Sequence, residues 1–390
     1  MSFKSKDKQY IANTYGRFDL HLVSGKGSLV YDDSGKEYID MATGIAVNTF
    51  GVADEAWTAA VTAQLGQIQH TSNLYYSTPC IQLAELLCNR TGAKKVFFGN
   101  SGAEANECAI KVARKWAQDS FGKGDYTIIT LKNSFHGRTI TTLAATGQDV
   151  FHTDFNPFPA GFVYATANDL SSVEKCFAEN KVCAVMMELV QGEGGVLPLD
   201  KEFVRGVEVL CRKNNALLMI DEVQTGNGRT GSLYAFQGYG ISPDVVSTAK
   251  GLGGGLPIGA TMLFERVENT LTAGSHGSTF GGNPIAAAGA VSIIERIDEE
   301  VLAGVRARSE YIVAELSGAE GIKSVSGLGL MLGVELTRDV NEVLADCFQM
   351  GVLPIKAKNK LRLLPALNIP MELLERAVAV IKAAAKGERI

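Results

Sequence analysis

Long apolar runs and blocks of like charge are both missing from this sequence of 390 residues. No apolar run approaches the roughly 18 residues that a membrane-spanning helix requires, and the lysine-rich start has no apolar core like that of a secretory signal. The net charge of −5, without basic clusters, argues against nucleic acid or an anionic membrane as the main partner. We therefore expect a soluble, cytosolic protein that binds neither.

Cysteine and histidine are sparse and poorly grouped. The seven cysteines are scattered and never form a Cys-x-x-Cys pair, which is typical of reduced, mostly buried thiols. The five histidines show no spacing that suits metal ligands. The sequence therefore predicts no metal site.

Short apolar strands alternate with amphipathic helices between residues 94 and 265. This pattern predicts an α/β fold with a mostly parallel sheet covered on both faces. In the helix expected at 102–119, for example, apolar residues from Ala105 to Trp116 recur at helical spacing. The expected strands lie near 95–99, 126–131, 161–165, 183–189, 216–221, 244–249 and 258–264, and the expected helices near 102–119, 168–179 and 200–214.

The two ends of the chain follow different patterns. Residues 1–50 hold short strands around a turn at 33–35, and helices follow at about 54–69 and 79–91. Beyond residue 283 the sequence predicts a smaller α+β segment. Its expected elements are helices near 284–297, 299–316, 341–350 and 371–386, and strand-like residues at 323–336 and 352–355.

One glycine-rich stretch organises the candidate site. The β-prone run 245–249 brings Lys250 to the end of a strand, and five of the next nine residues are glycines. Open α/β sheets bind ligands beside the carboxyl ends of their strands. A lysine amine whose pKa is lowered can form a Schiff base with a carbonyl. The pattern indicates a lysine used in chemistry, and the alternative is a solvated lysine in a flexible loop.

The turn at 98–104 joins a strand to a helix. Small residues such as Gly102 and Ala103 leave the first helical N–H groups open, which favours a phosphate there. A tight turn that uses these residues for geometry alone is equally compatible. Gly99-x-Ser101-x-Ala103 also nearly matches the nucleophile elbow of serine hydrolases. That alternative needs a late histidine, and the last one is His276.

A buried strand at 216–220 leads directly into Asp221. An ionised aspartate there costs several kcal/mol unless it is paired, so Asp221 needs a cationic partner. A protonated pyridine nitrogen would serve, and the carboxylate would keep that ring an electron sink. The alternative is an aspartate that caps a loop. The Gly-x-Gly-x-x-Gly match at 226–231 is not a dinucleotide fingerprint, because residues 232–243 give no helical pattern.

Two arginines and two further loops complete the set of candidates. Phe135 could stack on a flat ring, and Arg138 offers a planar fork that suits a carboxylate, although a core phenylalanine and a surface ion pair are equally possible. The glycine-rich loop at 274–283 offers hydroxyls to an anion. Arg362 lies in an apolar strand and must have an acidic partner or an anionic ligand.

Together these residues suit pyridoxal phosphate chemistry on an amine that carries a carboxylate. Over nearly its whole length the chain resembles the class III, ornithine-type aminotransferases, most closely those that act on N-acetylornithine. It departs from their common motifs at residues 51–54 and at Pro365-Ala366. The resemblance rests mainly on Phe98-Gly99-Asn100-Ser101-Gly102-Ala103-Glu104, Asp221-Glu222-Val223-Gln224-Thr225-Gly226, the lysine loop and Leu361-Arg362-Leu363-Leu364-Pro365.

The resemblance implies a role for each matching residue. Lys250 would form the Schiff base with pyridoxal 5′-phosphate and move the proton, with Asp221 as the partner of the ring nitrogen. Thr279 would reach the phosphate of a neighbouring subunit, which implies a homodimer. The other residues implied in cofactor binding are Ser101, Gly102, Ala103, Phe135, Glu222, Val223 and Gln224. Those implied in substrate binding are Tyr15, Arg138, Glu193, Ser278 and Arg362.

The resemblance also implies a fold, a domain division and a reaction. The fold is that of type I pyridoxal-phosphate transferases. The large cofactor-binding domain would span 51–282, and a small domain would form from 1–50 and 283–390. The reaction would be transamination between N-acetylornithine and 2-oxoglutarate, in arginine synthesis, with Glu193 pairing with Arg362 and swinging away for glutamate. Alternatives are ornithine, succinylornithine, 4-aminobutyrate or acetyl-lysine-type aminotransferases, a serine hydrolase using Ser101, and a catalytically silent cofactor-binding protein.

Overall fold

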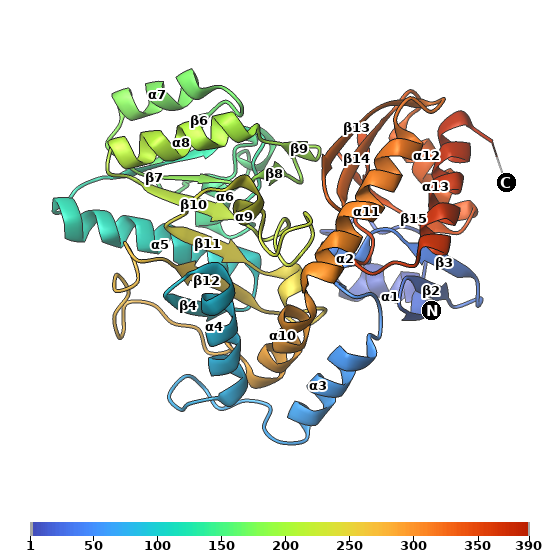
Figure 1. Ribbon diagram of the computed structural model, residues 1–390, viewed down its shortest axis with the longest axis horizontal. Coiled ribbons are helices and arrows are strands. Elements are labelled where there is room, and N and C mark those ends of the chain that lie inside the picture. The colour runs from blue at the N-terminus through green and yellow to red at the C-terminus, as the bar shows by residue number, and fades with distance from the viewer. Residues whose placement is uncertain (1–2, 389–390) are drawn as a thin grey trace.

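A seven-stranded sheet forms the middle of one lobe of the computed structural model, which describes residues 3–388 (Figure 1). The strand order is β4-β12-β11-β10-β7-β5-β6, and every strand points the same way except β12, which is antiparallel to both neighbours. The predicted α/β fold with a mostly parallel sheet is confirmed. The strands are β4 (Lys95–Gly99), β5 (Thr127–Leu131), β6 (Phe162–Ala165), β7 (Val182–Met187), β10 (Leu217–Asp221), β11 (Val245–Thr248) and β12 (Gly259–Leu263).

Helices cover both faces of this sheet, and β10 explains how. Its side chains alternate: Leu217 and Met219 pack in one apolar cluster with α5, whereas Leu218 and Ile220 pack in another with α8. A strand buried on both faces needs apolar residues throughout, so it shows no polar alternation in the sequence. The covering helices are α4 (Thr78–Thr91), α5 (Gly102–Phe121), α6 (Ile140–Ala145), α7 (Leu170–Glu179), α8 (Lys201–Lys213) and α10 (Pro284–Arg296).

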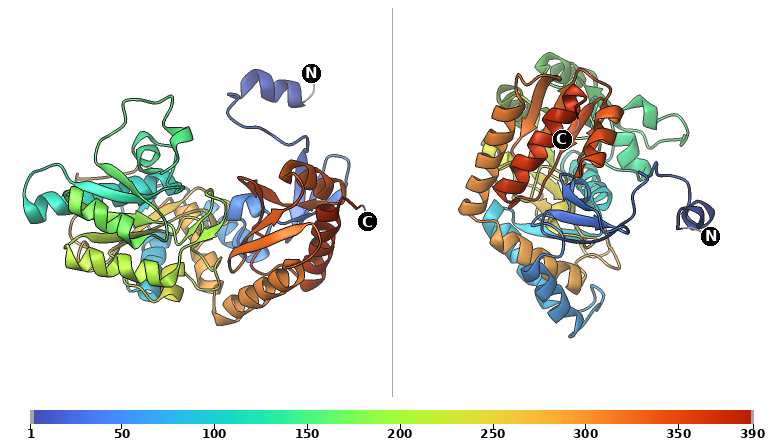
Figure 2. Two further views of the ribbon diagram at one scale, coloured as in Figure 1. Left: turned by 90° about the horizontal axis from the view of Figure 1, so that it is seen from above. Right: turned by 90° about the vertical axis from the view of Figure 1, so that its right-hand side faces the viewer.

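The second lobe combines segments from both ends of the chain (Figures 1 and 2). In its first sheet, β3 (Glu37–Asp40) lies between β2 (Leu29–Asp32) and β15 (Val352–Leu353), and β2 also pairs with β1 (Leu22–Lys26). The predicted domain boundaries, after residues 50 and 282, stay predictions. A second sheet contains β13 (Ile322–Leu328), β14 (Met331–Leu336), β17 (Lys360–Leu363) and β16 (Ile355–Ala357), beside α11 (Glu299–Leu316), α12 (Val340–Gln349) and α13 (Met371–Lys386).

Two helix predictions need correction. The helix expected at 54–69 ends earlier, as α3 (Glu55–Leu65), because Gly66 forms its C-cap. The stretch 232–243 was expected to contain no helix, yet it holds the short α9 (Ala235–Tyr239). There the buried Glu222 carboxylate accepts the Phe236 N–H at 2.7 Å, and Gly240 ends the helix in the left-handed conformation. The hydrogen bond comes from a residue distant in sequence, and the glycine cap depends on one backbone conformation. Helical periodicity in the sequence reveals neither of them.

The peripheral elements complete the description. Helix α1 (Phe3–Tyr10) has no buried residue and stands away from the body of the protein in both views of Figure 2. Between residues 3 and 388, no helix is both long and apolar enough to cross a membrane. The remaining short elements are α2 (Thr43–Ala46), η1 (Asp149–Phe151), β8 (Val190–Gln191), β9 (Leu197–Pro198) and η2 (Lys250–Leu252).

Candidate active site

A cavity of about 430 Å³ opens at the carboxyl ends of the parallel strands. Several strand ends contribute to it: the turn after β4, the loops after β5 and β7, and the residues that follow β10 and β11. Such an edge is the usual ligand site of an open α/β sheet. The sequence-predicted residues that line the cavity are Ser101, Gly102, Ala103, Phe135, Arg138, Glu193, Asp221, Val223, Gln224 and Lys250.

Five predicted residues lie outside the lining of this cavity. Arg362 contacts it indirectly, through Glu193 and Gln224. The Ser278 hydroxyl accepts a hydrogen bond from Asn100, a lining residue, at 3.1 Å. Thr279 is exposed on the same loop, and Tyr15 is 70% exposed in the N-terminal segment. The Glu222 carboxylate binds the Phe236 N–H and the Thr225 hydroxyl instead, so the structure does not support its predicted cofactor contact.

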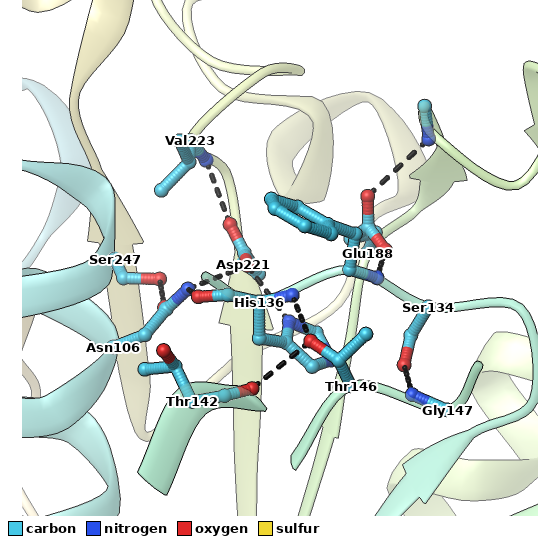
Figure 3. Close-up of polar contacts among 12 residues, drawn as sticks. Asn106, Ser134, His136, Thr142, Thr146, Gly147, Glu188, Asp221, Val223 and Ser247 are labelled. Carbon is cyan, nitrogen blue, oxygen red and sulfur yellow. Dashed lines mark hydrogen bonds and ion pairs between the residues drawn. The ribbon is translucent and has the colours of Figure 1, made fainter. Parts of the chain in front are cut away.

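Asp221 is held by two other segments of the chain and by the backbone that follows it (Figure 3). Its Oδ2 lies 2.8 Å from His136 Nδ1 and accepts a hydrogen bond from Asn106 Nδ2 at 2.8 Å, while Oδ1 accepts the Val223 N–H at 3.0 Å. Burial lowers the pKa of His136, but the hydrogen bond and charge of Asp221, with the charge of Glu188, more than offset this and raise it. Asp221 therefore already pairs with a side chain of the protein, that of His136.

Sequence reasoning missed both His136 and Asn106. Histidine was considered as a metal ligand, and nothing in the sequence pairs it with an aspartate 85 positions later. Asn106 carried a usable signal, because it lies one turn after Gly102 and so projects from the same face of α5 as the helix start. Its side chain also accepts the Ser247 hydroxyl of β11 at 2.5 Å, which joins α5 to two adjacent strands.

Lys250 follows β11 in a left-handed backbone conformation, with φ of 46°. Glycines fill the turn after it, and Gly251, for instance, lies against Thr49, where a Cβ would approach the hydroxyl to 2.8 Å. Burial lowers the pKa of the Lys250 amine, more strongly than the negative charge of Glu193 raises it. A lowered pKa favours the neutral amine, which is the form that acts as nucleophile or base.

The two candidate arginines have different surroundings. The Arg138 guanidinium lies over the rings of Phe151, at 4.4 Å, and Phe135, at 5.6 Å. It forms no ion pair with any carboxylate in the described part of the chain. Arg362 is 3% exposed, and its Nη1 lies 2.7 Å from Glu193 Oε1 and 3.2 Å from Gln224 Oε1. Phe151 was not predicted, because an aromatic residue that stacks on an arginine leaves no local motif.

Pyridoxal phosphate fits the residues of this cavity. Gly102 and Ala103 occupy the first turn of α5, where helical N–H groups have no intrahelical partner. A Cβ added at Gly102 would lie 2.6 Å from Val223 Cγ1, so a larger residue would fill the space between helix start and β10 loop. An anion site, a buried carboxylate for a ring nitrogen and a lysine with lowered pKa thus meet in one cavity.

The hydrolase alternative fails on geometry. The Ser101 hydroxyl accepts the Glu104 N–H at 3.2 Å and donates to Glu104 Oε2 at 3.2 Å, which makes it the N-cap of α5. His136 is paired with Asp221, but within residues 3–388 its Nε2 has no hydrogen-bond partner and so does not activate Ser101. A nucleophilic serine needs its base within hydrogen-bond reach.

Comparisons with known proteins give the relatives of this chain. The family profile "Aminotransferase class-III" matches residues 10–385. An acetylornithine aminotransferase of Haemophilus ducreyi is 50% identical over 380 residues, 97% of each chain. A succinylornithine transaminase of Yersinia pseudotuberculosis is 43% identical over 94% of this chain and 92% of its own. The ornithine aminotransferase of Toxoplasma gondii, crystallised with partial occupancy of pyridoxal phosphate, has a TM-score of 0.94 at 31% identity, covering 99% and 94% of the two chains.

Replacing Gly102 by Ala tests the phosphate site. The added methyl group would press on Val223, and such overpacking costs about 1–3 kcal/mol. We expect the Kd for pyridoxal phosphate to rise at least about tenfold in titrations of the apoprotein. Gly66→Ala is the matched control, because its Cβ would make only an ordinary 3.5 Å contact with Ala63 O. An unchanged Kd in Gly102→Ala would contradict this placement of the phosphate.

Proposed function

This chain belongs to the class III aminotransferases, which depend on pyridoxal phosphate, and we propose its reaction from that membership. It transfers the δ-amino group of N2-acetyl-L-ornithine to 2-oxoglutarate, and so forms N-acetyl-L-glutamate 5-semialdehyde and L-glutamate, as in arginine biosynthesis. The observation that carries the proposal is the unequal state of two arginines: among residues 3–388, Arg138 has no carboxylate partner, whereas Arg362 has Glu193. The likeness to the Haemophilus relative also supports it.

Bound pyridoxal phosphate supplies a carbonyl that combines with amines and a ring that withdraws electrons from the neighbouring carbon. Ser101, Gly102 and Ala103 would hold its phosphate at the start of α5. Phe135 and Val223 would lie against the ring, and Gln224 near its oxygen. Each of these residues lines the cavity, which is the basis for this assignment.

Asp221 would keep the ring nitrogen protonated. Its Oδ2 already serves His136 and Asn106, so Oδ1 is the oxygen with capacity for a further donor. A carboxylate beside the nitrogen raises that nitrogen's pKa and so preserves the electron-withdrawing ring. His136 and Asn106 keep the carboxylate in place while it does so.

Lys250 would take the proton from Cδ of acetylornithine and later return a proton at the reacting carbon of 2-oxoglutarate. A base that works near neutral pH needs a pKa below the ordinary value for lysine, and burial provides this. Among the acids, Glu193 and Asp221 act most strongly on the Lys250 amine, and their negative charges oppose the effect of burial on its pKa.

The two arginines explain how one site can bind two unlike substrates. Acetylornithine has one carboxylate, far from its reacting amine, which would bind Arg138. Glutamate has a second carboxylate beside the reacting carbon, which would bind Arg362. With acetylornithine bound, an unpaired Arg362 would be a costly buried charge, and Glu193 removes that cost. The pKa of Glu193 is lowered, since the charge and hydrogen bond of Arg362 outweigh the effect of its burial, so Glu193 is ionised and able to pair.

We also propose a cytoplasmic homodimer. The segment Leu74 to Tyr76 is highly exposed, with Leu74 at 87% and Tyr76 at 96%. Asn73, just before it, donates hydrogen bonds to Ser278 O and Gly281 O in the loop that carries Thr279. Apolar residues so exposed beside a candidate anion loop suit a subunit interface that brings Thr279 to the partner's phosphate. All seven cysteines are unpaired, as in a reducing compartment.

A donor panel tests the substrate. Single-turnover reactions with acetylornithine, succinylornithine, ornithine and 4-aminobutyrate, followed by the absorbance of the cofactor, should give the highest kcat/KM for acetylornithine. The identity to a succinylornithine transaminase makes succinylornithine the main competitor. A preference for ornithine or 4-aminobutyrate would overturn the substrate assignment, and no turnover with any amine would indicate a catalytically silent protein.

Glu193→Ala should affect the two half-reactions unequally. Without Glu193, Arg362 stays open to α-carboxylates and becomes an unpaired charge when acetylornithine binds. The acetylornithine half-reaction should therefore lose at least about tenfold more of its rate than the glutamate half-reaction, a difference of roughly 1.4 kcal/mol. Glu202→Ala, at the exposed first turn of α8, is the control. Equal losses would show that Glu193 does not gate Arg362.

Hybrid dimers test whether sites are shared between subunits. Lys250→Ala and Thr279→Tyr should each be inactive alone. If Thr279 completes the partner's site, each hybrid dimer has one intact site, made of Lys250 from one subunit and Thr279 from the other. After random subunit exchange, half of the dimers are hybrid, so about a quarter of the wild-type activity should return. No recovery, with exchange verified by mass spectrometry of tagged subunits, would mean that each site is built within one chain.

A further inference from the structure

Glu188 is a buried carboxylate that the proposed reaction leaves without a role. It follows β7, lines the cavity and is 7% exposed. Its pKa is raised to about 7, mainly by burial. The charge of His136 lowers this pKa, and the charge of Asp221 raises it further. A group so costly to bury needs a compensating function.

Both oxygens of Glu188 accept backbone hydrogen bonds, and the two donors belong to different loops (Figure 3). Oε1 accepts the Phe135 N–H at 2.8 Å, in the loop after β5 that also carries Arg138. Oε2 accepts the Gly192 N–H at 3.3 Å, immediately before Glu193. One carboxylate thus joins the residue proposed to flank the ring to the residue proposed to gate Arg362.

The same two loops touch at other points. Gln191 Nε2 donates to Lys132 O at 2.9 Å, and a Cβ at Gly194 would come within 2.7 Å of Asn133 O. Glycines flank Glu193 on one side at 192 and on the other at 194 and 195, and the turn is closed only by two long backbone hydrogen bonds, from the N–H groups of Gly195 and Val196 to Gly192 O at 3.4 and 3.3 Å. Further support comes from the neighbouring loop and from Glu188.

We propose that Glu188 is a positioning residue that locks the Phe135 loop and the Glu193 loop together. With both loops fixed, exchange between the two substrates involves rotation of the Glu193 side chain rather than movement of its backbone. The inference deepens the proposed function and rests on it for the roles of Phe135 and Glu193. The lock itself is a property of the protein chain, so it can be measured separately.

Two substitutions separate geometry from charge. Glu188→Gln keeps the size but presents one amide NH₂ group, which cannot accept from a backbone N–H. Glu188→Asp keeps the charge but is one methylene shorter, so its two oxygens cannot reach both loops. If Glu188 acts by position, both variants release at least one loop contact. Glu208→Gln is the control, because Glu208 also accepts a backbone N–H, that of Ser242, away from the cavity.

Hydrogen exchange by mass spectrometry, with and without bound pyridoxal phosphate, measures the lock directly. In both Glu188 variants, the peptides that cover residues 133–138 and 188–196 should both exchange roughly tenfold faster than in the wild type, and the rest of the chain should exchange at the wild-type rate. In Glu208→Gln, these two peptides should also exchange at the wild-type rate. Glu193→Ala should leave the Phe135 loop protected. In the two Glu188 variants, the Kd for pyridoxal phosphate should rise. The KM for acetylornithine should also rise, by a larger factor than that by which kcat falls.

Three results would overturn the proposal. Faster exchange in only one loop would show that Glu188 does not couple them. Unchanged exchange with a large loss of kcat would show that its charge acts on the reaction instead. Wild-type protection in Glu188→Asp, with loss in Glu188→Gln, would lead to the same conclusion. If acetylornithine is not a substrate, the exchange result still decides whether the lock exists, so the two hypotheses fail separately.

Discussion

The pairing of one buried carboxylate, that of Asp221, determines how the rest of the site is arranged. A carboxylate out of water costs several kcal/mol unless its oxygens are satisfied. Here the compensation comes from His136 after β5 and from Asn106 on α5, and Asn106 in turn is held by Ser247 of β11. Three strands and one helix must therefore converge at a single point. The start of α5 and the end of β11, with Gly102 and Lys250, are placed by the same convergence.

Charge balance around the cavity follows from this constraint. Three carboxylates, those of Glu188, Glu193 and Asp221, act electrostatically on Lys250 together with the positive charge of Arg362, and His136 lies against Asp221. The negative charges of these acids and the positive charges of Lys250 and Arg362 partly offset one another around the cavity. A lysine in such surroundings can lose or gain a proton without leaving a large uncompensated charge, which is what a base that works in both directions needs.

The sequence predicted the parts of the fold that depend on local pattern. Strand runs, helix stripes such as Ala105 to Trp116, and the gathering of the candidate site residues at strand ends follow from periodicity and sheet geometry. It did not reveal that β12 runs antiparallel, because an apolar run has no directional signal. Nor did it show that Glu222 turns away from the cavity while His136 turns toward Asp221. The direction of a side chain in a loop depends on contacts far along the chain, and these leave no motif.

The first sheet of the second lobe has a consequence for synthesis of the chain. Strand β3 ends at residue 40, and the strand that completes its other edge, β15, ends at residue 353. At 5–20 residues per second, the ribosome needs on the order of 15 to 60 s to make the intervening chain. During that time the backbone edge formed by Ile39 and Asp40 has no native partner. An exposed strand edge can pair with another chain. The nascent protein must therefore pass through an interval in which β3, made early, is open to such pairing until β15 has been synthesised.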